Sequence, residues 1–128
     1  METKLRAALI AWLRADPVLA ELNSITEEAP SRTSLPWLGI SASASADWST
    51  KEAAGREVRI ALELHERGDD PEPEAALVWA IEERIPALPR AQNGFDVVSI
   101  TFLRSRVEQR PNNLRAVLLE YRFRLLST

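Results

Sequence analysis

The chain has 128 residues, a net charge of −3 at neutral pH and no cysteine. This length suits one compact domain over residues 1–128, and a chain without cysteine has neither a disulfide framework nor a thiolate metal site. The small negative charge argues against bulk binding of nucleic acid, and no stretch approaches the roughly 18 apolar residues needed to cross a bilayer.

The N-terminal part of the chain predicts a helix followed by a loop. Over residues 2–15 apolar side chains recur at helical spacing and basic side chains occupy the other side, which predicts an amphipathic helix. An Asp-Pro pair ends it, because a residue before proline disfavours helical torsions. A helical turn over 18–22 and a polar loop over 24–35 follow. A proline then opens a short strand over 37–40.

The next stretch, Ser41 to Gly55, is made almost entirely of small polar residues. Such a run buries little apolar surface, so we expect a mobile loop. Trp48 is the large aromatic in this loop and has two interpretations. It either anchors a partner protein or folds back onto its own domain.

The second half of the chain predicts three strands and one helix. Residues 56–67 alternate strictly between apolar and polar side chains, which predicts a strand with one buried face. A turn and a helix to about residue 84 follow. Two strands, 95–107 and 114–125, are joined by a loop over 108–113. The predicted fold is α+β, with two helices packed on one face of a four-stranded, mostly antiparallel sheet.

The sequence offers no constellation that suggests catalysis. His65 is the only histidine; it is expected on the polar face of its strand, solvated or at an interface, and one histidine without cysteine builds no typical zinc site. No Gly-x-Ser-x-Gly elbow surrounds a serine, the paired carboxylates sit in loops, caps or helix surfaces, and four glycines form no phosphate loop. We therefore expect no enzyme activity, no cofactor and no metal.

Charge is distributed unevenly along the chain. Residues 1–103 carry 10 basic and 17 acidic groups, a balance of −7, and residues 104–128 carry 6 basic and 2 acidic groups, a balance of +4. Such a polarised chain is able to attract a second copy of itself. The plainer interpretation is scattered surface charge. The C-terminal arginines lack interleaved stacking aromatics, which disfavours sequence-specific binding of nucleic acid.

Several segments, taken in order, resemble a family of phage tail completion or tail terminator proteins, which includes prophage and gene transfer agent relatives. They are the helix LRAALIAWLRADPVLAEL, the strand LPWLGIS, the segment DWSTK, the strand GREVRIALELHER, the helix EAALVWAIEERI and the final strand ending in YRFRLL. The proline-rich sequence PALP departs from the family pattern at the end of the second helix. The resemblance covers nearly the whole chain.

The resemblance implies a homo-oligomeric ring, expected to be a hexamer, that sits on the finished tail tube. Such a ring stops polymerisation of the major tail tube protein and joins it to a head-side connector or stopper protein. It implies a virion or phage-like particle, assembled in the bacterial cytoplasm, and no membrane. Two alternatives remain: a head–tail connector or other neck protein, and a small cytoplasmic ligand-binding or enzymatic α/β domain.

Two groups of residues are predicted to contact the tube or a neighbouring subunit. The first is the loop segment around the tryptophan, because an aromatic side chain in a loop of small residues is a plausible interface hot spot. The second is the basic last hairpin, which complements the acidic front of the chain. The predicted contact residues are Asp47, Trp48, Ser49, Thr50, Lys51, Arg104, Arg106, Arg110, Arg122 and Arg124.

Overall fold

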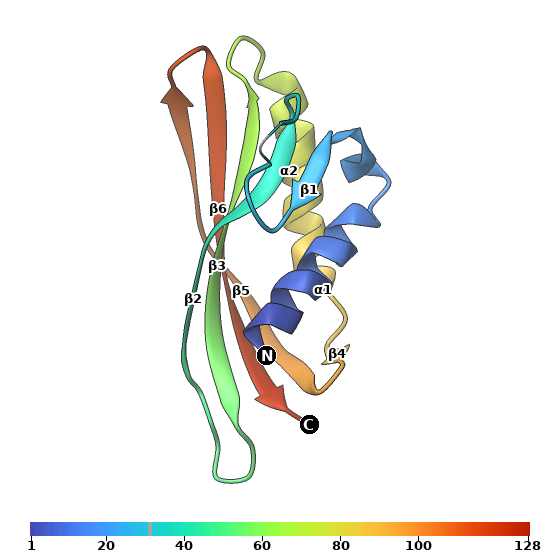
Figure 1. Cartoon of the computed structure of the whole chain (residues 1–128), viewed down its shortest axis with the longest axis vertical. Helices are drawn as coiled ribbons and strands as arrows, with labels where there is room; N and C mark the ends of the chain where they lie inside the picture. The colour runs from blue at the N-terminus through green and yellow to red at the C-terminus, as the bar shows by residue number, and fades with distance from the viewer. Residues whose placement is uncertain (31) are drawn as a thin grey trace.

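The computed structural model describes residues 1–30 and 32–128 as a curled six-stranded sheet that wraps around two helices (Figure 1). The order of strands across the sheet is β1-β2-β3-β6-β5-β4. The elements are α1 (Glu2–Arg14), η1 (Val18–Glu21), β1 (Ser24–Thr26), β2 (Trp37–Asp47), β3 (Gly55–Arg67), α2 (Glu72–Arg84), η2 (Ile85–Ala87), β4 (Ala91–Gln92), β5 (Phe95–Arg110) and β6 (Leu114–Ser127).

The prediction of a four-stranded, mostly antiparallel sheet is wrong, although the α+β class holds. The sheet has six strands and is mixed, because β1 pairs in parallel with β2. β1 lies within the predicted loop 24–35, of which residue 31 falls outside the described residues. β4 adds two residues at the other edge. Both extra strands are too short to show an alternating pattern.

The predicted mobile loop over 41–55 is also wrong, because its first half continues β2 as far as Asp47. After a register shift between Ile40 and Ala42, Ser43 and Ser45 contact side chains of α1. Ser45 Oγ donates to Glu2 Oε2 at 2.8 Å, and Arg6 donates to Ser43 Oγ at 3.3 Å. Contacts with a helix therefore help to stabilise the part of β2 that has no large apolar side chain.

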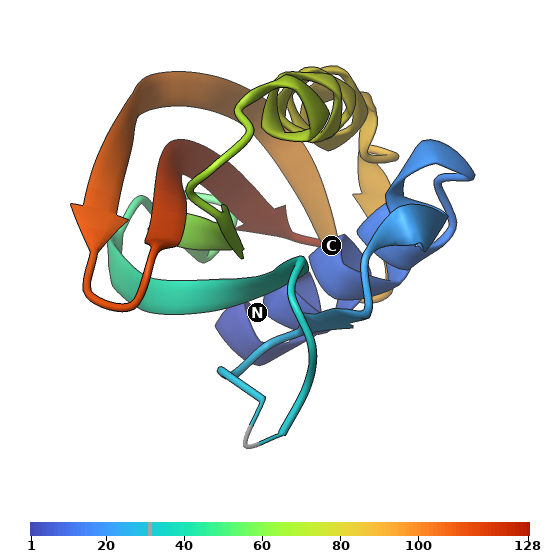
Figure 2. The ribbon, with the colours of Figure 1, turned by 90° about the horizontal axis from the view of Figure 1, so that it is seen from above.

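Irregularities in the ladders curve the sheet. The pairing of β5 with β6 shifts register between Val97 and Ser99 and again between Phe102 and Arg104. Bulges of this kind bend a strand and increase its twist. Seen from above, the sheet forms a half-barrel whose open side is filled by the two helices (Figure 2). The sheet therefore has an inner face towards the helices and an outer face turned away from them.

The core lies between the inner face and the helices. Leu5, Leu9 and Leu13 of α1 are fully buried, and so are Leu62 of β3 and Phe123 of β6. This matches the predicted amphipathic helix over 2–15 and the predicted buried face of the strand over 56–67, whereas Val98 and Phe102 of β5 are about half exposed. No helix in residues 1–30 and 32–128 is long and apolar enough to span a membrane.

The two helices are joined by contacts between Trp12 and Arg84. Trp12 Nε1 donates to the carbonyl oxygen of Arg84 at 2.7 Å, and Arg84 Nε donates to the carbonyl oxygen of Trp12 at 2.9 Å. The Arg84 guanidinium also lies 3.4 Å from the centroid of the indole ring. These contacts fix the end of α2, which falls at the predicted residue 84.

Candidate assembly surfaces

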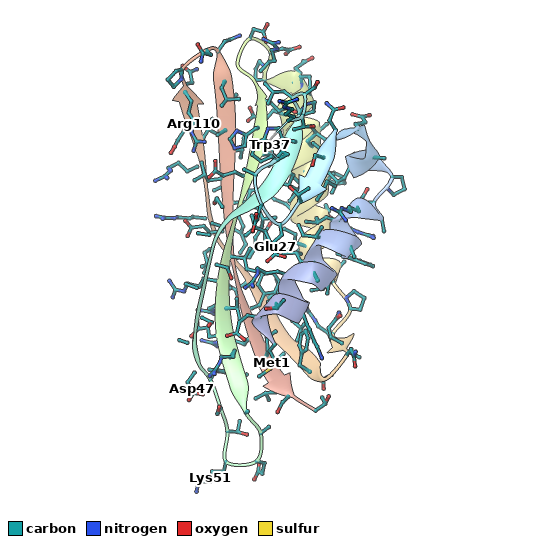
Figure 3. All side chains as sticks on the ribbon, viewed as in Figure 1. Met1, Glu27, Trp37, Asp47, Lys51 and Arg110 are labelled. Carbon is teal, nitrogen blue, oxygen red and sulfur yellow. The ribbon has the colours of Figure 1, made fainter. Side chains whose placement is uncertain are left out.

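The first predicted contact segment forms the tip of the hairpin between β2 and β3. Asp47 and Lys51 lie at the lower end of the molecule, beyond the helices (Figure 3). The turn closes through a backbone hydrogen bond from Trp48 N to Gly55 O at 3.0 Å. The tip projects because both strands continue past the part of the sheet that the helices cover.

Side-chain hydrogen bonds order this tip. Ser49 Oγ donates to Asp47 Oδ1 at 2.6 Å and accepts a bond from Gly55 N at 3.0 Å. Thr50 Oγ1 accepts a bond from Ala53 N at 3.0 Å, and Thr50 N donates to Ala53 O at 2.9 Å. Serine and threonine hydroxyls commonly close turns in this way. The segment is a structured turn with Lys51 exposed, in contrast to the mobile loop predicted.

Trp48 adopts the second of its two predicted arrangements and packs against its own sheet. Its ring is partly buried, and the guanidinium of Arg124 on β6 lies 5.5 Å from the ring centroid. Gly55 allows this close packing, because a Cβ atom there would lie 2.8 Å from Leu125 O and would clash with Trp48 O. Part of the indole stays accessible, so Trp48 remains a predicted contact residue.

The predicted arginines of the last hairpin lie on the outer face of the sheet. Arg104 on β5 reaches Glu120 at 3.0 Å, and Arg122 and Arg124 on β6 lie 3.4 and 3.9 Å from Glu57 of β3. Each pair joins neighbouring strands. The basic surface therefore carries its own carboxylates, and the pair of the exposed Arg104 with Glu120 contributes at most about 1 kcal/mol.

Sequence reasoning did not include β3 in this surface. Arg59 of β3 is exposed on the outer face and lies opposite Arg122 in the sheet register. The sequence does indicate that β3 has a polar face, because the alternation over 56–67 places Glu57, Arg59 and Glu63 on the same side of the strand. What the alternation does not reveal is that β3 and β6 are neighbours.

At the upper end of the outer face, Arg110 belongs to a polar cluster around His65. Arg110 donates to Glu63 Oε1 at 2.8 Å, and the same oxygen lies 3.0 Å from His65 Nε2. The imidazole stacks on the Trp37 ring, with centroids 4.0 Å apart and planes 7° apart. His65 is only 7% exposed, so the expectation of a solvated residue is wrong.

The surroundings of this cluster set its charges. Burial lowers the pKa of His65 and the nearby Arg110 lowers it further, while Glu63 acts in the opposite sense. Burial raises the pKa of Glu63, but the hydrogen bond and charge of Arg110 outweigh it, so the pKa of Glu63 falls below its usual value. The cluster holds an ionised carboxylate beside a mainly neutral imidazole at pH 7.

The structure does not bring the two predicted contact groups together in one site. The hairpin tip with Asp47 and Lys51 lies at one end of the long axis, and Arg110 lies near the other end (Figure 3). The outer face connects them through Arg124, which contacts Trp48. The predicted residues therefore mark one long surface with two distant ends.

Two edges of the sheet are open in the described part of the chain. β2 pairs with β1 only through its first three residues, which leaves 40–47 without a partner on that side. β5 pairs with β4 only at its start, which leaves 98–110 unpaired on its outer edge. Open edges present backbone donors and acceptors to another chain. The bulges in β5 limit non-specific pairing at that edge.

Comparison with known proteins identifies the family of this chain. The model of the family "Tail completion protein gp17" matches residues 7–126. The chain belongs to this family. Its role is thus structural and lies in the completion of a phage-type tail, as the sequence resemblance predicted.

A solved structure supports the fold. A chain from the "Virion of native gene transfer agent (GTA) particle" is similar, with a TM-score of 0.84 and 22% sequence identity. The match covers 98% of this chain and 96% of that chain. A search of curated proteins finds no match to this chain. The tail completion protein therefore shares its fold with a chain of a gene transfer agent particle over 98% of its length.

Proposed function

We propose that this tail completion protein is a tail terminator, acting as a single domain over residues 1–128. Copies assemble into a ring, in our proposal a hexamer, on the last ring of the tail tube. The ring stops polymerisation of the major tail tube protein and presents its other side to the head-side connector or stopper protein. In this role the protein needs no cofactor, membrane or specific nucleic-acid sequence, and it performs no reaction.

The observation that carries the proposal is the pair of unlike open edges. A closed ring requires one patch of each copy to contact a different patch of the next copy. The free edge of β2 and the free edge of β5 lie at opposite sides of the sheet order, so they supply two such patches. β2 and β5 also run antiparallel in the sheet, which suits antiparallel pairing between neighbouring copies.

The projecting hairpin tip supplies a separate contact along the ring axis. It extends past the helices at the end of the long axis, where Lys51 is exposed (Figure 3). A tip that is already ordered loses little conformational entropy on binding. We propose that this end docks onto the tube and that the opposite end, near Arg110, faces the head.

The experiment is co-expression with the tail tube protein of the same particle, followed by electron microscopy. A terminator gives tubes that carry extra density at one end and do not elongate further when fresh tube protein is added. Tube protein alone gives tubes of variable, growing length. A head–tail connector or stopper leaves tubes bare and growing, and that result would refute the terminator role.

A further inference from the structure

Each open edge of the sheet contains one regular segment that begins after a bulge. In β2 the segment 42–47 follows the register shift at Ile40, and it has no strand partner on the side away from β3. In β5 the segment 104–110 follows the shift at Phe102 and ends with the strand. A regular edge suits pairing with another strand, whereas a bulge interrupts it. The two segments therefore match in length as well as in direction.

Outer-face side chains carry opposite patterns of charge on β5 and β3. Arg106 and Glu108 are successive outer-face residues of β5. Glu57 and Arg59 are successive outer-face residues of β3, with the order of charges reversed. β3 and β5 run in the same direction, because both pair antiparallel with β6. The two strands are therefore complementary in charge when they lie side by side in the right register.

Short side chains on β2 allow charged groups to meet across that strand. Ala44 lies opposite Arg59, and Ala46 lies opposite Glu57. Two hollows of about 160 and 250 Å³ lie here on the outer face, and Ala44 and Arg59 line both of them. A strand that pairs with the free edge of β2 lies about 10 Å from β3. Arginine and glutamate side chains together span that distance.

Arg59 has a like charge as its neighbour in its own chain. It is exposed and lies directly opposite Arg122 in the ladder, and like charges in that position destabilise a sheet. The carboxylate of Glu57 lies 3.4 Å from Arg122 and 3.9 Å from Arg124, and no ion pair of Arg59 is found within residues 1–30 and 32–128. A carboxylate supplied by another copy would offset this repulsion.

We propose that β5 of one copy pairs antiparallel with β2 of the next copy, with Glu108 opposite Ala44. The proposal rests on the ring described above and specifies the register of its strands. In this register 105–110 pairs with 42–47, so the regular segment of β2 is paired along its whole length. Glu108 then faces Arg59 across β2, and Arg106 faces Glu57.

Other registers of the same pairing are disfavoured by face or by charge. A shift of one residue would place the outer face of one copy beside the inner face of the next. A shift of two residues places Arg106 or Arg110 opposite Ala44, where either one meets Arg59 as a like charge. Hydrogen bonds along the two edges supply the attraction, and charge fixes the register.

The register also gives a strand tilt that suits a closed ring. Through the ladders of one copy, Ala44 lies level with Arg122 of β6. Glu108 lies level with Ala116 of the same strand. The offset per copy, from residue 122 to residue 116, is therefore about 20 Å. Four strands per copy span about 19 Å across the sheet. These two lengths give a tilt of about 46°, close to the range of about 35–45° in closed sheets.

On the inner face the same register covers an exposed apolar residue. Val107 of β5 is 47% exposed, and it would lie opposite Ser45 of the next copy. Ser45 contacts Glu2 of α1, so Val107 would also approach that helix. Pairing therefore removes apolar surface from water in addition to forming backbone hydrogen bonds.

Cysteine cross-linking measures the register directly, because the chain has no cysteine. Each test chain carries Val107→Cys together with Ser43→Cys, Ser45→Cys or Asp47→Cys. Within one copy these positions lie on β5 and β2, with β3 and β6 between them, so a disulfide joins two copies. The chains are oxidised with the tail tube protein present and separated on a denaturing gel. The chain with Ser45→Cys should cross-link at least about fivefold faster than the other two, because directly opposite Cβ atoms lie about 5 Å apart and diagonal ones about 7–8 Å apart.

Charge reversal tests how the register is selected. Arg59→Glu should raise the concentration that caps half of the tubes by at least about tenfold, because the new carboxylate faces Glu108. This variant should remain folded, since its new charge lies opposite Arg122. Glu108→Arg in the same chain should restore capping to within about threefold. Arg90→Glu, an equal change of charge at an exposed residue outside both edges, should have no effect.

The results distinguish this register from the terminator role. Faster cross-linking through residue 43 or 47, or capped tubes without any of the three cross-links, would overturn the register. Unchanged capping by Arg59→Glu would overturn the opposition of Arg59 and Glu108. Copies that cross-link through residue 45 but leave tubes growing would contradict the terminator role alone. Copies that neither cap tubes nor cross-link would contradict both proposals.

Discussion

Replacement of Trp48 by alanine separates folding from assembly. The ring is partly buried and interacts with the Arg124 guanidinium, a contact of about 0.5–1 kcal/mol at an exposed site. Removal of a fully buried tryptophan costs about 3–5 kcal/mol, so a partly exposed one at a hairpin tip should cost about 2 kcal/mol. Small domains have about 5–15 kcal/mol of stability, so Trp48→Ala should remain folded. Its melting temperature should fall by about 8 °C.

The assay measures both properties of the same preparation. Circular dichroism gives the melting temperature, and electron microscopy of tubes grown with each variant gives the capped fraction. We expect Trp48→Ala to lose capping at a temperature where it is fully folded. The matched control is Trp79→Ala, because Trp79 is 65% exposed on the outer side of α2 and should change neither property. Retained capping by Trp48→Ala would refute the role of the hairpin tip, and lost capping by Trp79→Ala would place the tube contact on α2.

Three further predictions concern stability. Tyr121→Phe should leave the unfolding free energy unchanged or raise it by about 1 kcal/mol in urea titrations, because the buried hydroxyl of Tyr121 has no partner in the described residues. A fall in the unfolding free energy of more than about 1 kcal/mol would contradict this. Gly55→Ala should lower the unfolding free energy by more than about 2 kcal/mol, because the new Cβ atom clashes with the backbone oxygen of Trp48. An unchanged urea midpoint would refute the close approach of the Trp48 backbone to Gly55. Folding lowers the pKa of His65 below 6.5, so the folded state favours the neutral imidazole. The stability associated with the neutral imidazole is therefore present above pH 6.5 and is lost on acidification. Stability should fall from pH 7.5 to 5.5, and His65→Gln should flatten that dependence.

The long regular elements could be predicted from the sequence. The alternation over 56–67 gave β3 almost to the residue, and helical spacing gave α1. The continuation of β2 beyond Ile40 could not be predicted from the sequence, because its small side chains bury little apolar surface and show no alternation. Ser43 and Ser45 are held by side chains of α1, and such contacts between distant segments leave no local pattern. Edge strands of two or three residues escape periodicity for the same reason.

The candidate surfaces were predicted in part. The arginines of the last hairpin do share the outer face, but alternation fixes this only for Arg122 and Arg124 in the regular strand β6. In β5 the bulge between Phe102 and Arg104 decides the face, and no local pattern in the sequence marks it. The partners of these arginines could not be predicted, because the pairing of Glu57 with Arg122 and Arg124 depends on which strands are neighbours. The burial of His65 under Trp37 depends on the same register. The family resemblance predicted the biological role before any of these contacts was known.

Arginines on the outer face form ion pairs within the same chain, and this affects which contacts are able to stabilise the assembly. Alternation alone presented that face as a basic patch ready to attract acidic neighbours. In the structure Arg104, Arg122 and Arg124 already contact carboxylates of the same chain, so docking onto these side chains gains little from charge. Backbone groups without a strand partner in the described residues lie elsewhere, at the open edges of β2 and β5. Pairing of these edges between copies adds hydrogen bonds, whereas docking on the outer face exchanges ion pairs already made, so the contacts that close a ring should lie at these edges.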